Sequence, residues 1–578
     1  MAGAVKLIEN IDIGKIFEEV ADLLDLQGAN QFRVRAYRTA ARTVESLTVS
    51  CASLATTDPK ALQTLPGIAK DLAGKICEIV QTGDLAVRRE LIAEIPEGLV
   101  EIMRIPALGP KRARQFYDAF GIQSLVALEE AARSGKLREL RGIKETLEAK
   151  ILQGIADRQA AGGRFRLSEA EAYVKPLVDF LRQSQRLRAI DVAGSYRRRR
   201  DTVGDIDILA VEGKRPAVAN RFLSYPLVRD VLAKGDTKCS IVLRPGLQID
   251  LRIVREESYG AALHYFTGSK PHNIAIRTLG VKQGLKINEY GVFRGDRRIG
   301  GHTEEEVFGA VGLPWIPPEL REDRGEIDRA RENRLPKLVE ARQIKGDLQM
   351  HTTYSDGKNT ILEMLQACRD LGYEYLAITD HTKAVAITGG LDRAGFRKQF
   401  REIERAQKSL PQIQILKGAE VDILEDGNLD LDDATLRELD LVVVSVHSRF
   451  NMSRTDMTRR VTRAMRHSAA RILAHPTGRI LGRREPYPLD MEEVVKTARD
   501  HGVMLEINAQ PERLDLNDLH TQMAKNAGVK LVISSDAHRV EELGCMRYGV
   551  DQARRGWCET QDVANTRRWT EFQKLIAK

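Results

Sequence analysis

Residues 375–381 read YLAITDH, a short apolar run that ends on an aspartate and a histidine. Six further apolar runs end on or near a histidine or a carboxylate: DLQMH (347–351), ILKGAE (415–420), LVVVSVH (441–447), RILAH (471–475), VMLEIN (503–508) and LVISSDAH (531–538). Helix-length segments separate these runs. The alternation predicts a barrel of parallel strands with a helix after most of them.

Histidine is concentrated in the same part of the chain. Eight of the 11 histidines lie beyond residue 345, and five of them end one of the runs. Parallel barrels place their active sites at the carboxyl ends of the strands. Imidazole combined with carboxylate suits Mn²⁺ or Zn²⁺. We therefore expect residues 346–578 to form a metal-dependent barrel enzyme. His467, His501 and His520 lie in helix-like segments and are expected to be ordinary surface or core residues.

Composition excludes several other classes of protein. The 578 residues are 42% apolar and 30% charged, with a formal charge of +8, which weakly favours a polyanionic partner. No apolar run approaches the ~20 residues that span a bilayer, and residues 1–20 lack the regions of a signal peptide. The six cysteines are scattered without a CxxC pair, which indicates a reducing compartment. We expect a cytoplasmic, nucleoid-associated monomer with no membrane contact.

The helical N-terminal part, residues 1–160, contains a weak repeat: LPGIAKDLAGKI (65–76), IPALGPKRARQF (105–116) and LRGIKETLEAKI (140–151). Each copy has a tight turn with glycine before a helix, so that the first-turn amides can face a phosphate. A single copy could equally be an ordinary glycine-capped turn. The first two, followed by Lys70 and Lys111, favour DNA binding, whereas the third departs more and can be structural.

The middle part, residues 161–325, contains AGSYRRRRDTVGDIDILAV (193–211) and LQIDLRIV (247–254). Strand alternation places Asp205 and Asp207 on one face, and Asp250 joins them if its strand is the neighbour. Three carboxylates repel one another unless divalent cations neutralise them, and Mg²⁺ prefers oxygen ligands. Two such ions can activate a hydroxyl and stabilise a leaving pyrophosphate. A lone DxD would be a solvated turn, but the ordered set is far more specific.

From about Leu7 to Glu322 the chain resembles the family X DNA polymerases, the group of DNA polymerase beta. GSYRRRRDTVGDID resembles their catalytic block, QIDLR the strand of the third carboxylate, and HYFTGSKPHNIAIR (264–277) the segment that cradles the incoming nucleotide. The resemblance implies that Asp205, Asp207 and Asp250 bind two Mg²⁺ or Mn²⁺ ions, and that Asp250 helps to activate the primer hydroxyl. Gln248 departs from the family, where an arginine is common, which weakens the expected grip on the primer.

The same resemblance assigns binding roles to other residues of this chain. It implies a dNTP site, with the triphosphate at Ser195 and Arg198, the sugar at Tyr265, Phe266 and Gly268, the base at Asn273, and a further contact at Gly204. It implies DNA contacts at Gly67, Lys70, Gly109, Lys111, Lys238 (primer phosphate) and Arg277 (templating nucleotide).

Lys75 stands where some relatives carry a lysine that removes 5′-deoxyribose phosphate. Such a lysine must be partly neutral, which requires desolvation or cationic neighbours. Here Asp71 and Asp84 replace basic residues, and Arg33 stands where a lysine is often found. A plain phosphate contact by Lys75 is therefore the favoured alternative to lyase activity.

The C-terminal part resembles the PHP (polymerase and histidinol phosphatase) phosphoesterases. GDLQMHTTYSDG, AITDHT, GAEVDI, SVHSRF, AHPTGR and SSDAH follow their motifs in order, and the fusion is that of bacterial and archaeal family X polymerases. The resemblance implies up to three Mn²⁺ or Zn²⁺ ions. The expected ligand sets are His351, Glu420 and Asp536; Glu420, His447 and His475; and Asp356, His381 and His538. Gln349 replaces a histidine of the usual HxH, and an amide is the poorer ligand.

The expected fold is multidomain: helix-hairpin-helix modules, an α/β nucleotidyltransferase palm with a thumb, and a (β/α)7-type PHP barrel. The expected boundaries are an 8-kDa-like helical domain at 1–85, a fingers-like domain at 86–160, the palm at 161–255, the thumb at 256–322, a charged, partly helical linker at 323–345 and the barrel at 346–578. We expect a gap-filling repair polymerase acting on gapped or primer-template DNA, with a 3′–5′ exonuclease that could also cleave abasic sites. Two alternatives remain: a DNA-end-binding polymerase with a purely structural barrel, and a phosphatase of small esters.

Overall fold

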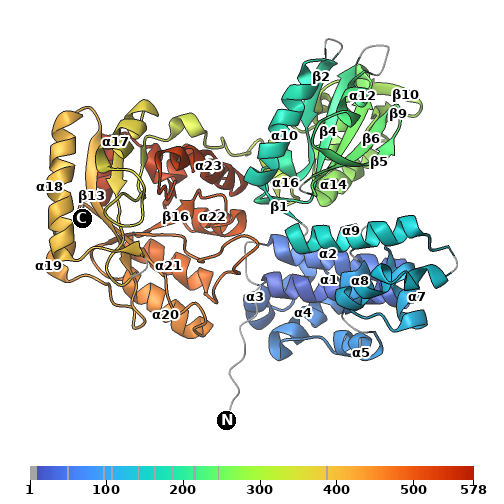
Figure 1. The fold of residues 1–578 in the computed structure, drawn as a ribbon, viewed down its shortest axis with the longest axis horizontal. Coiled ribbons are helices and arrows are strands. Elements are labelled where there is room, and N and C mark those ends of the chain that lie inside the picture. Colours follow the sequence, from blue (N-terminus) through green and yellow to red (C-terminus); the bar gives the residue numbers. More distant parts are fainter. Residues whose placement is uncertain are drawn as a thin grey trace. The chain divides into compact units, whose positions relative to one another are not determined.

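The structure is a computed structural model. It describes residues 10–47, 51–95, 98–103, 105, 108–140, 142–161, 164–184, 187–212, 217–244, 246–385 and 388–577. The chain divides into two compact units, residues 1–164 and 165–578 (Figure 1). Among the described residues, no helix is long and apolar enough to cross a membrane.

The first unit is built from helices. Apolar residues at helical spacing, such as Val20, Leu23 and Leu24 of the first helix, form its buried core. Gly83 and Gly121 adopt left-handed backbone conformations that end two of the helices. The helices are α1 (Asn10–Gln27), α2 (Gln31–Ser46), α3 (Cys51–Thr57), α4 (Lys70–Thr82), α5 (Ala86–Glu94), α6 (Gly98–Met103), α7 (Pro110–Phe120), α8 (Leu125–Arg133) and α9 (Glu145–Ala161), with 3-10 turns η1 (Ala61–Thr64) and η2 (Lys136–Glu139).

The second unit begins with a mixed sheet whose strand order is β2-β4-β7-β6-β5. β4 and β7 pair in parallel, and the other neighbours are antiparallel. Helices α10 and α12 supply apolar residues to the core of this sheet. The elements are β1 (Phe165–Arg166), α10 (Leu167–Arg182), β2 (Leu187–Val192), α11 (Gly194–Arg197), β3 (Thr202–Val203), β4 (Asp205–Glu212), α12 (Val218–Leu223), β5 (Val228–Lys234), β6 (Lys238–Leu243) and β7 (Gln248–Val254).

A smaller helical and antiparallel part follows the sheet. Its core includes Ile276, Val307 and Phe308. The segment expected to be a linker begins tightly packed, because Glu326 is buried with its Oε1 2.6 Å from Nδ1 of His272. The elements are η3 (Glu256–Ser258), α13 (Tyr259–Thr267), α14 (Lys270–Lys282), β8 (Lys286–Asn288), β9 (Gly291–Arg294), β10 (Arg297–Gly300), α15 (Glu304–Ala310), η4 (Pro318–Leu320), α16 (Glu326–Arg331) and η5 (Ala341–Gln343).

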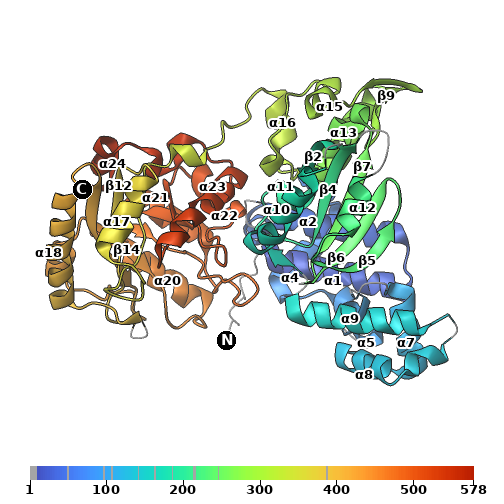
Figure 2. The same cartoon turned by 45° about the horizontal axis from the view of Figure 1, so that its top comes forward.

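The C-terminal part is the expected seven-stranded parallel barrel. Its strands pair in sequence order from β11 to β17. A bridge between Met350 and Ala537 brings the first and last strands together, and the amide of His351 donates to the carbonyl of Ala537 at 2.8 Å. Helices α17 and α18 cover the outside of the barrel (Figures 1 and 2). The strands are β11 (Gly346–Asp347), β12 (Tyr375–Ile378), β13 (Gln414–Asp422), β14 (Leu441–Ser445), β15 (Ala470–Leu473), β16 (Met504–Asn508) and β17 (Leu531–Ser534).

The barrel helices alternate with these strands and present apolar faces to them. They are α17 (Ile361–Asp370), α18 (Arg393–Ser409), α19 (Asp433–Leu436), α20 (Arg454–Met465), α21 (Met491–His501), α22 (Asp518–Asn526), α23 (Met546–Arg555) and α24 (Trp569–Ile576), with 3-10 turns η7 (Val540–Cys545), η8 (Thr560–Asp562) and η9 (Ala564–Thr566).

Gly260 offers a test of the packing between α13 and the start of α15. A Cβ added at Gly260 would lie 2.1 Å from the carbonyl carbon of Thr303, whereas nothing lies within 4 Å of a Cβ at Gly309. Gly260→Ala should lower the free energy of unfolding by about 1–3 kcal/mol, because backbone atoms must move apart. Gly309→Ala, the matched control, should change it by less than about 1 kcal/mol. Guanidinium unfolding of the full chain compares them, and equal stability would contradict this close contact.

Candidate active sites

The palm carboxylates meet because β4 and β7 are parallel neighbours. The register places Asp207 opposite Asp250 and Asp205 opposite Gln248. Asp205 and Asp207 share one face of β4, since successive side chains alternate. Asp205 is exposed, whereas Asp250 is buried on β7, the central strand of the sheet. The three predicted carboxylates are thus brought to one end of two strands.

The electrostatics of these carboxylates are unequal. Burial and the charge of Asp205 raise the pKa of Asp207 to about 6. Burial also opposes ionisation of Asp250, but hydrogen bonds from Lys238, Ser240 and Gln248 outweigh it and lower the pKa of that carboxyl. A strained like-charge cluster of hard oxygen donors is the donor set that suits two divalent cations.

Basic groups flank the same cluster. Lys238 Nζ lies 2.9 Å from Asp250 Oδ2, and Gln248 Nε2 donates to Asp250 Oδ1 at 3.1 Å. Sequence reasoning missed Arg252, whose Nε lies 3.8 Å from Asp207 Oδ1 and whose guanidinium lies over the ring of Phe266. Its position two residues after Asp250 on the same strand face was the signal that could have found it.

The glycine-serine turn lies directly against these carboxylates. Gly194 has φ +66°, and a Cβ there would lie 3.3 Å from Asp207 Oδ2. The amide of Ala193 donates to the carbonyl of Asp207 at 2.8 Å, which fixes the turn to β4. Ser195, the second residue of the short helix α11, is half-buried.

The residues expected around the sugar and base also come together. Asn273 Nδ2 donates to the carbonyl oxygens of Tyr265 and Gly268 at 2.6 and 3.2 Å. A Cβ at Gly268 would lie 2.3 Å from Asn273 Oδ1, so this turn needs glycine. Arg277 lies one turn further along α14 and is exposed.

Glu304 anchors the palm loop to the thumb through two arginines. Its carboxylate accepts from Arg197 Nη1 and Nη2 at 2.8 and 2.9 Å, and from the fully buried Arg321 at 2.5 and 3.0 Å. Burial opposes ionisation of Glu304, but these hydrogen bonds hold its pKa well below the ordinary value. Sequence reasoning missed this group, because its partners lie 17 and 107 residues away along the chain.

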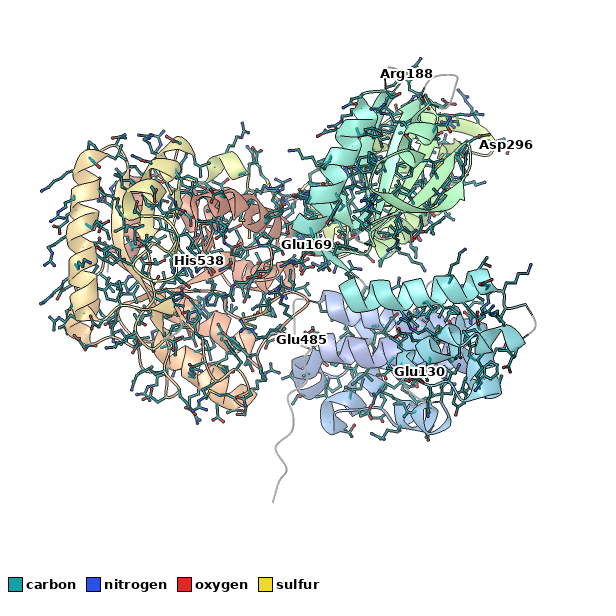
Figure 3. The ribbon with its side chains drawn as sticks, viewed as in Figure 1. Glu130, Glu169, Arg188, Asp296, Glu485 and His538 are labelled. Carbon is teal, nitrogen blue, oxygen red and sulfur yellow. The ribbon has the colours of Figure 1, made fainter. Side chains whose placement is uncertain are left out.

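The barrel gathers all eight predicted ligands at the carboxyl ends of its strands; Figure 3 labels His538 among them. Ligand atoms within each of three groups lie within 4.8 Å of one another: His351, Glu420 and Asp536; His381, Glu420 and His447; and His351, Asp356, His381 and His538. The first group equals an expected set. The second group contains His381 with Glu420 and His447, where the expected set had His475 in place of His381. His475 is nevertheless close, with its Nε2 2.9 Å from Glu420 Oε1. The third adds His351 to the expected set.

Several buried atoms of this cluster are free to bind an ion. Among the described residues, His351 Nδ1, His381 Nδ1 and Glu420 Oε2 are buried and form no hydrogen bond, although His381 Nδ1 and Glu420 Oε2 lie 3.3 Å apart. Unpaired buried nitrogen and oxygen atoms are costly unless a metal satisfies them, so the donor set fits Mn²⁺ or Zn²⁺. Both amide atoms of Gln349 are likewise buried and unpaired. Burial disfavours ionisation of Glu506 beneath the cluster and raises its pKa well above the ordinary range.

Four of the DNA-binding candidates, Gly67, Lys70, Gly109 and Lys111, lie at or near helix starts in the first unit. Gly67 has φ +75° just before α4, Lys70 is the exposed first residue of α4, and Gly109 is the N-cap of α7. The side chain of Lys111 lies outside the described residues. Lys75 Nζ lies 2.5 Å from Asp71 Oδ2, and an ion-paired lysine is a poor nucleophile.

Comparison with known proteins agrees with this architecture. The chain matches the family models described as helix-hairpin-helix domain (residues 8–85), SAM-like helix-hairpin-helix tandem (99–157), DNA polymerase beta thumb (262–322) and PHP domain (347–510). The DNA polymerase/3′-5′ exonuclease PolX of Bacillus subtilis (strain 168) is 37% identical over 572 residues, covering 98% of this chain and 99% of that protein. The chain therefore belongs to the family X DNA polymerases that carry a C-terminal PHP domain.

Other relatives are similar to about a third of this chain. A probable phosphatase of Thermoanaerobacter sp. (strain X514) is 30% identical over 210 residues, covering 34% of this chain and 81% of that protein. A probable phosphatase of Clostridium acetobutylicum is 27% identical over 202 residues, covering 33% and 78%.

The Glu304 group predicts a defined pH response. Its folded pKa is depressed, so its contribution is full above the unfolded value of 4.5 and is lost as the pH falls below that value. Glu304→Gln should cost about 3–5 kcal/mol at pH 7, because it leaves Arg321 buried without its carboxylate. The difference from wild type should shrink as the pH is lowered through 4.5. Thermal melts across pH test this, with exposed Glu305→Gln as the neutral control; a pH-independent difference would contradict it.

Proposed function

We propose that this chain is a template-directed DNA polymerase with a 3′–5′ exonuclease in its barrel. The observation that carries the polymerase assignment is the parallel register that sets Asp207 beside Asp250, with Asp205 on the same face and the Gly194-Ser195 turn against them. The Bacillus subtilis relative is named for both activities, and its similarity extends over nearly the whole chain.

The palm residues divide the work of nucleotide addition. Asp205, Asp207 and Asp250 would hold two Mg²⁺ or Mn²⁺ ions, which lower the pKa of a primer hydroxyl and stabilise departing pyrophosphate. Asp250 lies deepest in the sheet and would orient the primer end, with Lys238 beside it near primer phosphate. Ser195 and Arg198 would bind the triphosphate, with Gly204 beside them. Tyr265, Phe266, Gly268 and Asn273 would bind the sugar and base, and Arg277 the templating nucleotide.

DNA repair is the setting that this design favours. Exposed Lys70 and the helix starts after Gly67 and Gly109 would grip phosphates without reading sequence, as gapped DNA requires. We propose short-gap filling during repair, in the cytoplasm at the nucleoid. All six cysteines are free thiols, which suits a reducing compartment. The Lys75–Asp71 pair favours a phosphate contact over lyase chemistry at Lys75.

In the barrel, buried unpaired donors support up to three Mn²⁺ or Zn²⁺ ions held by the eight predicted ligands. Such ions would supply an activated water and neutralise the scissile phosphate. The DNA-binding modules on the same chain favour a 3′ DNA end as substrate, and abasic sites are a second substrate of the same chemistry. A purely structural barrel is the alternative, because Gln349 weakens one position. A small-ester phosphatase is favoured only by relatives that are named probable phosphatases and are similar to about a third of this chain.

The palm assignment predicts a clean separation of activities. Asp205→Asn or Asp207→Asn should reduce nucleotide addition by at least about 100-fold, since each removes a metal-binding charge. Degradation of 3′ ends should stay at the wild-type rate. Gapped, 5′-labelled DNA with dNTPs and Mg²⁺ gives both rates on one gel. Asp230→Asn, an exposed carboxylate of the same sheet, is the control. Gap filling by the Asp205 and Asp207 variants at the control rate would disprove the assignment.

The barrel assignment predicts the reverse separation. His381→Ala should abolish 3′-end degradation and spare polymerisation, because His381 belongs to two of the three ligand groups. Gln349→His should lower the Mn²⁺ concentration for half-maximal activity, because imidazole binds Mn²⁺ better than an amide. Isothermal titration with Mn²⁺ gives the affinity independently of activity.

The matched control is His467→Ala. His467 lies outside the ligand cluster and pairs with Asp433. Wild-type degradation by His381→Ala would assign the nuclease elsewhere. No degradation by wild type at any Mn²⁺ concentration would favour the structural barrel.

A further inference from the structure

Arg555, the last residue of α23, connects the barrel to the palm. Its side chain is 1% exposed. Its Nη1 donates to the backbone carbonyl of Arg198 at 2.7 Å and to Glu322 Oε1 at 3.1 Å. Its Nη2 donates to the carboxylate of Asp518 in α22, which holds the guanidinium in place. A buried arginine of the barrel thus reaches the loop that follows Gly194-Ser195.

Glu322 joins Arg555 to the side chain of Arg198. One carboxylate oxygen, Glu322 Oε1, accepts from Arg198 Nε at 3.0 Å as well as from Arg555. Arg198 Nη1 donates to the carbonyl of Thr267 at 2.8 Å. Its Nη2 makes no hydrogen bond to the described residues, so one edge of the guanidinium is left for a phosphate. Arg555 therefore contacts the main chain of Arg198 directly and its side chain through Glu322.

Other barrel residues hold the same loop. Arg199 Nε donates to Asp551 Oδ2 at 2.7 Å, one turn before Arg555 on α23. Arg479 Nη1 donates to Asp201 Oδ2 at 3.1 Å. Three positions of the loop, at 198, 199 and 201, are thus bound by barrel side chains. The palm's own elements hold only part of this loop.

We propose that Arg555 is a positioning residue for nucleotide binding in the palm, so that the barrel serves polymerisation as well as its own chemistry. The inference rests on the proposed polymerase function. Without Arg555, the carbonyl of Arg198 loses a charged donor, and Glu322 keeps its hydrogen bond from Arg198 and a longer contact with Arg200, whose Nη1 lies 3.7 Å from Glu322 Oε1. The guanidinium is then drawn toward Glu322 and is no longer fixed for the triphosphate, which loses binding energy that preorganisation supplies.

The test is steady-state gap filling by the full chain with a single dNTP. Arg555→Gln should raise KM for the dNTP about tenfold, the loss expected for a charge-assisted hydrogen bond. Its kcat should fall less than about threefold, because the reacting groups are untouched. Exonuclease activity should be that of wild type. Arg555→Lys keeps the charge but not the forked geometry, so its KM should lie between those of wild type and Arg555→Gln.

Arg554→Gln is the matched control, because it breaks a neighbouring pair, Arg554 with Glu319, that does not contact Arg198. It should leave KM within about twofold of wild type, because the broken pair lies apart from the groups that hold Arg198. Equal changes in KM for Arg554→Gln and Arg555→Gln would overturn the inference, as would a change in kcat alone.

A double-mutant cycle guards against simple misfolding. If Arg555 acts through Glu322, the effects of Arg555→Gln and Glu322→Gln on KM should be strongly non-additive. Additive effects would overturn the inference. If Arg555→Gln also loses exonuclease activity, Arg555→Lys decides: a raised KM with intact exonuclease supports the role, and an unchanged KM overturns it. No incorporation by wild type would instead disprove the polymerase function itself.

Discussion

Parallel strand pairing is the constraint on which both candidate active sites depend. Parallel neighbours begin at one edge of a sheet and end at the other, so residues far apart in sequence meet at either edge. In the palm one parallel pair, β4 with β7, sets Asp207 against Asp250. In the barrel, the parallel order of the seven strands brings Glu420, His447 and His475 together in the same way.

Carboxylates gathered in this way repel one another, and the two sites reduce this electrostatic repulsion by different means. In the palm, Lys238 and Arg252 lie beside the carboxylates, while Asp207 still has a raised pKa. In the barrel, the carboxylates of Glu420 and Asp536 contact histidines, and several donor atoms remain unpaired. Both arrangements have the chemistry of cation sites, and both would be less costly to fold once the cations are bound.

Buried arginine–carboxylate groups connect the parts of the second unit. Glu304 joins Arg197 to Arg321, and Glu322 joins Arg198 to Arg555. Each carboxylate satisfies two arginines, so no buried charge is left alone, and loss of either partner is costly. Such groups define orientation better than apolar contacts do, because hydrogen-bond geometry is directional. They therefore suit the loop that follows Gly194-Ser195.

The sequence by itself determined the seven-stranded barrel, the helical first unit and the identity of the candidate ligands. The hydrophobic period, the residues at the strand ends and the order of the motifs are local properties, so the sequence alone reveals them. Tertiary structure alone decided where the grouping of the ligands departs from the expected sets. The placement of His381 with Glu420 and His447 depends on strand stagger across the barrel. It also decided the contacts of Arg252, Glu304 and Arg555, because their partners come from packing between distant elements. In a sequence rich in arginine, the residues around one arginine do not indicate which carboxylate it will pair with.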